Sequence, residues 1–212
     1  MAVPVWSYQP HSPAPWAEVV PGHGPATVDE LLTLPDDGYT YEVVEGVLVR
    51  MAGSGKQAAR LGIRLGGKLE AYASEHALGI VTGADGVYKF PGAETGLVPD
   101  AAFYRAERDV EAPDDAKPIP FAPDLAVEVA SPDQSADAIT AKARRYLRAG
   151  TRLVWVVWPL SKHIDVWHVD VVTGPVRALA INDSLDGEDV IPGFTYPLAD
   201  LFRHPLRQES AE

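Results

Sequence analysis

The chain has 212 residues, a net charge of −12 and no cysteine, which suits one domain with a sizeable core. The lack of cysteine excludes disulfide frameworks, thiolate zinc sites and cysteine nucleophiles. The acidic balance argues against tight non-specific nucleic-acid binding, which depends on neutralising phosphates, but it does not exclude a carboxylate-rich metal site. With no apolar run near the ~20 residues that span a bilayer and no visible secretory signal, we expect a cytoplasmic protein without a membrane partner.

In chain order, the composition divides the sequence into three parts. Residues 1–26 are rich in Pro and Gly and predict a flexible arm. Residues 27–205 predict a single domain, and residues 206–212 predict a polar tail. We therefore look for the functional site within the middle part.

The domain opens with a helix and a hairpin. Thr27 begins a capping box, which predicts a short helix over residues 28–34. Two short apolar segments, residues 40–44 and 47–51, are separated by Glu-Gly and predict a tight β-hairpin.

Helical spacing of leucines predicts a long helix over residues 57–78, in which three glycines would let another element approach closely. A second helix is expected from Ser135 or Asp137 to Ala149, closed by Gly150. Residues 105–120 predict a surface loop. The remaining predicted elements are strands at 79–81, 86–90, 97–104, 124–130, 153–158, 164–169 and 176–181, and a helical turn at 198–202. This order indicates an α/β fold with a mixed central sheet flanked by helices.

Two carboxylates in apolar surroundings are the strongest functional signal. Asp100 begins an apolar run, and Glu128 lies within the apolar strand 124–130. Because strand side chains alternate, Glu128 shares a face with Asp124, Ala126 and Ala130, whereas the opposite face is fully apolar. A lone carboxylate buried there costs about 2–5 kcal/mol unless it meets a metal or a cation. The cost favours a functional role.

These residue types suit metal-dependent hydrolysis of a phosphodiester. Magnesium or manganese prefers oxygen ligands and commonly takes one or two carboxylates, which Asp100 and Glu128 could supply on adjacent strands. Glu42 could bind the metal directly or through water. Lys142, on the following helix with Tyr146 one turn further on the same face, could orient the attacking water or stabilise transition-state charge.

Several runs of the sequence resemble the Uma-two family of restriction-endonuclease domains, from about Thr27 to Phe202. The runs are Tyr41-Glu42-Val43-Val44-Glu45-Gly46, Val98-Pro99-Asp100, Pro123 to Pro132, Lys142 with Tyr146 and Gly150, Pro192-Gly193-Phe194, and Pro197 to Phe202. The resemblance implies the restriction-endonuclease-like fold of the PD-(D/E)xK nucleases, with a divalent metal held between carboxylates and DNA as the substrate.

Carried over onto this sequence, the resemblance makes Asp100 the first metal-binding acid, Glu128 the second and Glu42 an earlier acid. The superfamily pattern has a lysine two residues after the second acid, where this chain has Ala130. The resemblance then implies that Lys142 acts from the neighbouring helix. The predicted activity is a magnesium- or manganese-dependent endonuclease.

Structural roles are the alternatives for each of these residues. Asp100 could cap backbone N–H groups, and Glu128 could form a structural ion pair with Lys142. Asp124 is more typical of a structural acid at the entrance of its strand. The alternative for the whole protein is a catalytically inactive nuclease-fold module for binding or assembly, which the acidic charge and Ala130 favour.

Two surface features carry further expectations. A basic stripe recurs every four residues along the long helix and predicts a solvated face in preference to a track for phosphates. Its members are Lys56, Arg60, Arg64 and Lys68. The apolar strand at residues 153–158 and the strand after it could support a homodimer.

Overall fold

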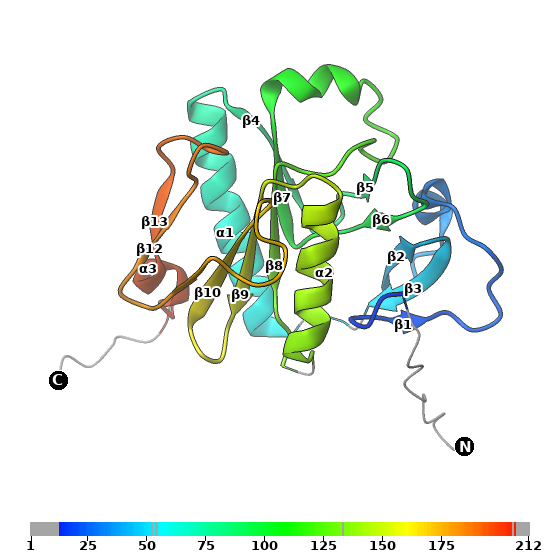
Figure 1. Ribbon diagram of the computed structural model, residues 1–212, viewed down its shortest axis with the longest axis horizontal. Coiled ribbons are helices and arrows are strands. Elements are labelled where there is room, and N and C mark those ends of the chain that lie inside the picture. The colour runs from blue at the N-terminus through cyan, green and yellow to red at the C-terminus, as the bar shows by residue number, and fades with distance from the viewer. Residues whose placement is uncertain (1–12, 52, 54, 133, 205, 207–212) are drawn as a thin grey trace.

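The computed structural model describes residues 13–51, 53, 55–132, 134–204 and 206 (Figure 1). The helices are α1 (Lys56–Glu75), α2 (Ala136–Arg148) and α3 (Leu198–Phe202), with 3-10 helices η1 (Val28–Thr33) and η2 (Ala106–Glu111). The strands are β1 (Glu18–Val19), β2 (Thr40–Val44), β3 (Val47–Met51), β4 (Gly79–Gly83), β5 (Tyr88–Lys89), β6 (Gly96–Leu97), β7 (Ala101–Arg105), β8 (Leu125–Val129), β9 (Leu153–Trp158), β10 (His163–His168), β11 (Arg177–Leu179), β12 (Ser184–Asp186) and β13 (Thr195–Pro197).

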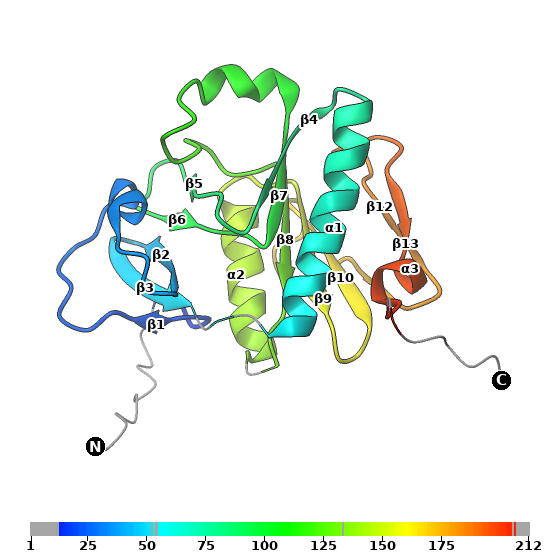
Figure 2. The same ribbon diagram turned by 180° about the vertical axis from the view of Figure 1, so that it is seen from behind.

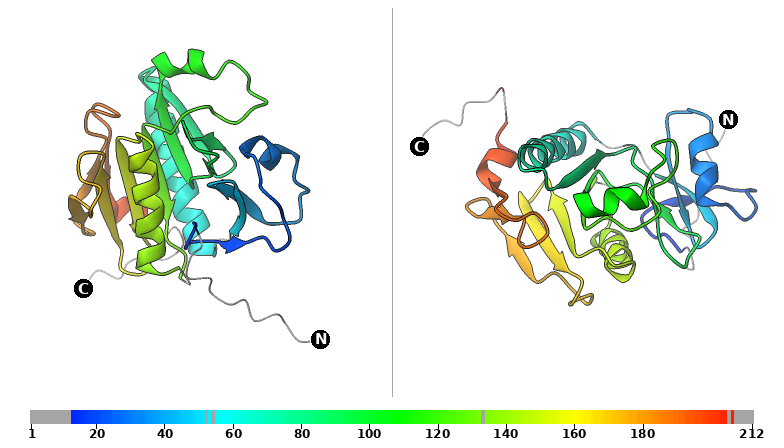
Figure 3. Two further views of the ribbon diagram at one scale, coloured as in Figure 1. Left: turned by 45° about the vertical axis from the view of Figure 1, so that its right-hand side comes forward. Right: turned by 90° about the horizontal axis from the view of Figure 1, so that it is seen from above.

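The main sheet of the described residues has six strands in the order β11-β10-β9-β8-β7-β4. Strands β8 and β9 are parallel and joined through α2, whereas the other neighbours are antiparallel. Helix α2 lies in front of the sheet in Figure 1, and α1 lies in front in the reverse view of Figure 2. The view from above in Figure 3 shows the strands between the two helices. The expected mixed sheet flanked by helices is therefore confirmed.

Alternation along β8 divides its side chains between the two helices. Leu125, Val127 and Val129 belong to the apolar cluster that contains the leucines of α1. Ala126 and Ala130 belong to the cluster that contains the apolar face of α2. Since Glu128 lies between these two alanines in the alternation, its side chain points toward α2, as the strand pattern predicts.

Helix α1 approaches the sheet closely at its glycines. A methyl group added at Gly66 would lie 3.4 Å from the Cβ of Ala101 on β7, and one at Gly62 would lie 3.6 Å from the Cβ of Asp100. Small residues on this face of α1 therefore bring the helix against the start of β7, the strand that Asp100 precedes.

A second sheet packs beside the first and carries Glu42. Its strand order is β1-β3-β2-β6-β5 among the described residues, and it lies to the right of α2 in Figure 1. The predicted hairpin is formed by β2 and β3, and the turn residues Glu45 and Gly46 have φ values of 54° and 76°. Such positive values suit the twist of a two-residue hairpin.

Part of the segment expected to be a flexible arm packs on this second sheet. Strand β1 pairs with β3, and Ala14, Trp16 and Ala26 are buried. Apolar residues within the Pro-rich stretch explain the difference, because they fill space beside β2 and β3 that the domain leaves uncovered. Residues 1–12 and 207–212 lie outside the described residues, and the boundaries of arm, domain and tail stay predictions.

Three further details differ from the expectations. Residues 106–111 of the predicted loop form the short helix η2, and β12 pairs with β13 in a hairpin that periodicity did not predict. Strand β9 lies between β8 and β10, and residues 153–157 are buried within the chain. This strand is therefore not available to a second copy, which removes it as a basis for the predicted homodimer.

Among the described helices, none is both long and apolar enough to cross a bilayer.

Candidate active site

Glu42 lies in the middle of β2, opposite Val49 of β3, and its side chain is fully buried. Its Oε2 accepts a hydrogen bond from Trp16 Nε1 at 2.7 Å. Its Oε1 accepts one from the backbone N–H of Val98 at 2.9 Å and lies 3.0 Å from Lys142 Nζ. Both carboxylate oxygens thus have donors, which is what a buried carboxylate requires.

Lys142 comes from the buried face of α2 and is 1% exposed. Its Nζ lies 2.9 Å from Glu128 Oε1 and 3.0 Å from Glu42 Oε1, and it donates to the carbonyl oxygen of Val98 at 3.4 Å. Burial disfavours the ammonium form, but the neighbouring carboxylates outweigh that effect and raise the pKa of Lys142. Lys142 is therefore a permanent cation at neutral pH.

Glu128 is 5% exposed and faces Lys142 and Tyr146, which lies one turn further along α2. The Tyr146 hydroxyl donates to Glu128 Oε1 at 2.8 Å. Burial raises the pKa of Glu128 to about 8, against the opposing attraction of Lys142 and with help from the charges of Asp100 and Glu42. Near neutral pH this carboxyl group therefore retains its proton in a large fraction of the molecules.

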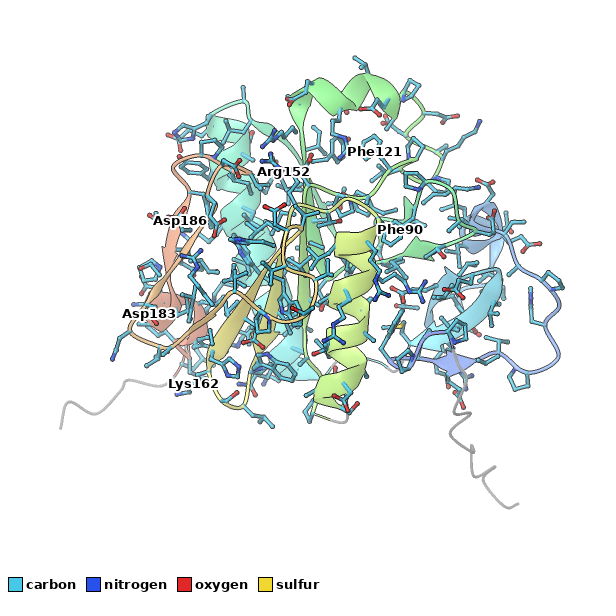
Figure 4. The ribbon with its side chains drawn as sticks, in the orientation of Figure 1. Phe90, Phe121, Arg152, Lys162, Asp183 and Asp186 are labelled. Carbon is cyan, nitrogen blue, oxygen red and sulfur yellow. The ribbon has the colours of Figure 1, made fainter. Side chains whose placement is uncertain are left out.

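Tyr146 is itself fixed by packing. Phe90, which follows β5 and is labelled beside α2 in Figure 4, meets the Tyr146 ring edge-on with 5.6 Å between ring centroids. Burial and the adjacent carboxylates raise the pKa of Tyr146 well above its ordinary value, so its hydroxyl stays a donor.

Asp100 precedes β7 and is partly exposed at the edge of the cluster. Its Oδ2 accepts a 2.6 Å hydrogen bond from the backbone N–H of Val129, whereas Oδ1 accepts none from the described residues. Burial raises the pKa of Asp100, opposed by the Val129 hydrogen bond and by the charge of Lys142. Asp100 therefore has an oxygen still available to a ligand.

A pocket of about 100 Å³ joins three of the four predicted residues. Asp100, Glu128 and Lys142 line it, although they come from the start of β7, from β8 and from α2. Glu42 does not line the pocket and contacts it through Lys142. Among the described residues, no three His, Cys, Asp or Glu side chains are grouped as a metal cage.

The tertiary structure adds one residue that the sequence analysis did not single out, the Glu42 partner Trp16. No local pattern predicts this contact, because Trp16 belongs to a Pro-rich stretch 26 residues before Glu42. An aromatic residue within such a stretch was the available signal. The partner of Glu128, Tyr146, was predicted to lie beside Lys142, and it does.

Asp124 and the basic stripe have structural partners. Asp124 Oδ1 lies 3.3 Å from Arg108 Nη1, and its Oδ2 accepts the backbone N–H of Arg105. In the basic stripe, Arg60 and Arg64 donate to backbone carbonyls at the end of α3 and just after it, and Lys68 lies over the Tyr196 ring. These arginines therefore fasten α3 to α1, which neither the solvated face nor the phosphate track anticipated.

Comparisons with known proteins bear on the fold and the family of the chain. A crystal structure described as a putative nuclease belonging to DUF820, from Anabaena variabilis ATCC 29413, matches with a TM-score of 0.68 at 20% identity, over 84% of this chain and 98% of that chain. At this identity the likeness establishes the fold. No curated protein matches the sequence. The Uma2 family model, described as "Putative restriction endonuclease", matches residues 28–199. The chain belongs to the Uma2 family.

Proposed function

We propose that this protein is a metal-dependent endodeoxyribonuclease that hydrolyses phosphodiester bonds in DNA. The observation that carries the proposal is the meeting of Asp100, Glu128 and Lys142 in one pocket. Two acids and a cation from separate elements are the groups that a metal-assisted phosphodiester hydrolysis needs. Family membership supports the nuclease class.

The donor set suits magnesium or manganese. Asp100 and Glu128 offer hard oxygen ligands, and Asp100 Oδ1 is not engaged by the described residues. Because magnesium usually keeps several waters and takes one or two carboxylates, a preformed cage of three acids is not required. When bound, the metal would polarise the phosphoryl oxygen and supply an activated water.

The remaining residues prepare the site for this chemistry. Lys142, held as a cation by two glutamates, would stabilise negative charge that develops on the phosphoryl group. Tyr146 holds Glu128 in a fixed orientation. Glu42 is fully buried and does not line the pocket, so we assign it first to the orientation of Lys142.

DNA as the substrate and a cytoplasmic location form part of the same proposal. A homodimer would need a surface other than β9, since both edges of that strand are paired. Within the described residues, the edge strands of the main sheet are β4 and β11, and these could pair with a second copy.

A plasmid-nicking assay tests the proposal. The wild-type protein should nick supercoiled plasmid with magnesium or manganese and should stop when EDTA is added. Asp100→Ala and Glu128→Ala should each abolish cleavage, whereas Asp170→Ala, which removes an exposed acid, should cleave as the wild type does. Full cleavage by either site variant would refute the assignment.

The second candidate is a nuclease-fold module without catalytic activity. It is favoured by the direct ion pairs that Lys142 makes with both Glu42 and Glu128, which are typical of a structural cluster as well. Calorimetric titration with manganese separates the two. Heat that disappears in Asp100→Ala supports the enzyme, and the absence of both heat and nicking over hours supports the module.

A further inference from the structure

The segment that precedes the family region reaches the buried end of the site. The family model begins at residue 28, yet Trp16 is 5% exposed and donates its indole N–H to Glu42 Oε2 at 2.7 Å. The same carboxylate contacts Lys142 Nζ through its other oxygen at 3.0 Å. Trp16 is thus two contacts away from the ammonium that faces the pocket.

Several independent contacts hold this segment in place. Strand β1 pairs with β3 at two positions, and Arg50 forms a 2.7 Å ion pair with Glu18. On the other side, Arg145 of α2 donates to the Pro13 carbonyl oxygen at 3.0 Å, and its guanidinium lies 5.8 Å from the Trp16 ring centroid. The segment is therefore anchored both to the second sheet and to the helix that carries Lys142.

The physical consequence follows from the burial of Glu42. Its side chain is fully buried, so water does not reach a carboxylate oxygen that has lost its hydrogen-bond donor. The carboxylate would then turn toward its remaining donors, Lys142 Nζ and the Val98 N–H. Such a turn would draw the ammonium away from Glu128 and from the pocket.

We propose that Trp16 is a positioning residue of the active site, which fixes Glu42 and through it the ammonium of Lys142. The inference rests on the proposed nuclease function for its effect on rate. It extends the functional unit to residues 13–19, beyond the region that the family model covers. Because Trp16 does not line the pocket, it acts on the rate and not on substrate binding.

The test uses Trp16→Phe in the full chain, with Trp158→Phe as the matched control. Trp158 Nε1 also donates to a carboxylate, Asp165 Oδ2 at 2.9 Å, but Trp158 does not line the pocket and makes no hydrogen bond to Glu42. We expect Trp16→Phe to lower kcat about ten- to a hundredfold, the size expected for a lost hydrogen bond to a charged group, with KM unchanged within about twofold. The control should keep the wild-type kcat.

A double variant shows whether Trp16 acts through Glu42. Once Glu42→Gln has changed the acceptor, adding Trp16→Phe should lower kcat by less than about twofold. The inference would be overturned if the kcat losses of the two single variants multiplied fully in the double variant. A wild-type kcat in Trp16→Phe, or an equal loss of kcat in the Trp158→Phe control, would also overturn it.

A spectroscopic measurement separates this inference from the proposed function. With ¹⁵N-labelled tryptophan, the Trp16 indole N–H resonance, assigned from its loss in Trp16→Phe, should be protected from solvent exchange. It should shift in Glu42→Gln, while the Trp158 resonance should not. A Trp16 resonance that does not shift in Glu42→Gln overturns the inference that Trp16 positions Glu42. A responsive one in a protein that cleaves no DNA refutes the nuclease function and leaves the Trp16–Glu42 contact established.

Discussion

Lys142 Nζ lies 2.9 Å from Glu128 Oε1, although the two residues belong to a helix and a strand and are 14 positions apart. Ala130 follows Glu128 on the same face of β8 and is buried against the apolar side of α2. The helix therefore delivers a cation to the face on which the strand itself carries none.

The cluster contains more carboxyl groups than Lys142 can neutralise. Glu42 and Glu128 contact the ammonium directly. Asp100 lies at the edge of the pocket, where the charge of Lys142 acts to lower its pKa. Burial, with help from the charges of Asp100 and Glu42, raises the pKa of Glu128 to about 8, whereas the carboxyl groups raise the pKa of Lys142 against the effect of burial. An added divalent cation would relieve the same imbalance.

Replacing Lys142 by methionine should destabilise the fold. Lys142→Met leaves Glu42 and Glu128 buried without their cation, and we expect the free energy of unfolding to fall by about 3–5 kcal/mol. Urea denaturation at pH 7 measures the change. Adding Glu42→Gln should recover part of the loss, because it removes a buried carboxylate that Lys142→Met leaves without its cation. A fall below about 1 kcal/mol would show that the ion pairs contribute little.

Removing the Tyr146 hydroxyl should cost less. Tyr146→Phe keeps the ring that packs against Phe90 but removes the donor to Glu128, so we expect a loss of about 1–3 kcal/mol of unfolding free energy. Tyr104→Phe is the matched control, since its hydroxyl donates to Asp109 in a more exposed place and its loss should cost under about 1 kcal/mol. Equal losses in the two variants would contradict the special role of the buried hydroxyl.

The stability of the metal-free protein should depend on pH through Glu128. The pKa of Glu128 is about 8 in the folded protein and near the ordinary value of 4.5 in the unfolded chain. The folded protein therefore binds this proton more tightly than the unfolded chain does. The resulting stabilisation is complete below about pH 4.5 and is lost as the pH rises to 8, at up to about 1.4 kcal/mol per pH unit.

Urea denaturation at pH 5, 6.5 and 8 in EDTA tests this dependence. Glu128→Gln, which does not titrate, should show a shallower decline in unfolding free energy than the wild type over the same interval. Lys142 contributes equally at all three pH values, since its pKa lies above them. Parallel curves for the two proteins would mean that Glu128 is already ionised.

Arg64 should stabilise the protein and leave DNA binding unchanged. Its Nη1 donates to the carbonyl oxygens of Asp200, Leu201 and Arg203 at the end of α3. Arg64→Met should therefore lower the unfolding free energy by about 1–2 kcal/mol. Arg148→Met removes the same charge from an exposed position and should leave stability unchanged within about 0.5 kcal/mol.

The same two variants decide whether the basic stripe tracks phosphates. If Arg64 contacted DNA, its loss would weaken binding and reduce the salt dependence of the KM for plasmid, whereas we expect both to match those of Arg148→Met. A selective loss of affinity in Arg64→Met would restore the phosphate-track interpretation.

The sequence by itself determined the layers of the fold and the acids most worth testing. Two-residue alternation assigns Leu125, Val127 and Val129 to one helix and Glu128 to the other, because a strand must turn successive side chains to opposite faces. Helical spacing likewise fixes Lys142 and Tyr146 on one face of α2. These periodicities are local, so they survive without knowledge of the contacts.

Only the tertiary structure decided which charges meet. Asp124 and Glu128 share a face of one strand, yet the first pairs with Arg108 and the second with Lys142. The contact of Trp16 with Glu42 and the docking of α3 by Arg64 also join segments far apart in the chain. Such pairings depend on how separate elements pack, and no periodicity along the sequence encodes the distance between them.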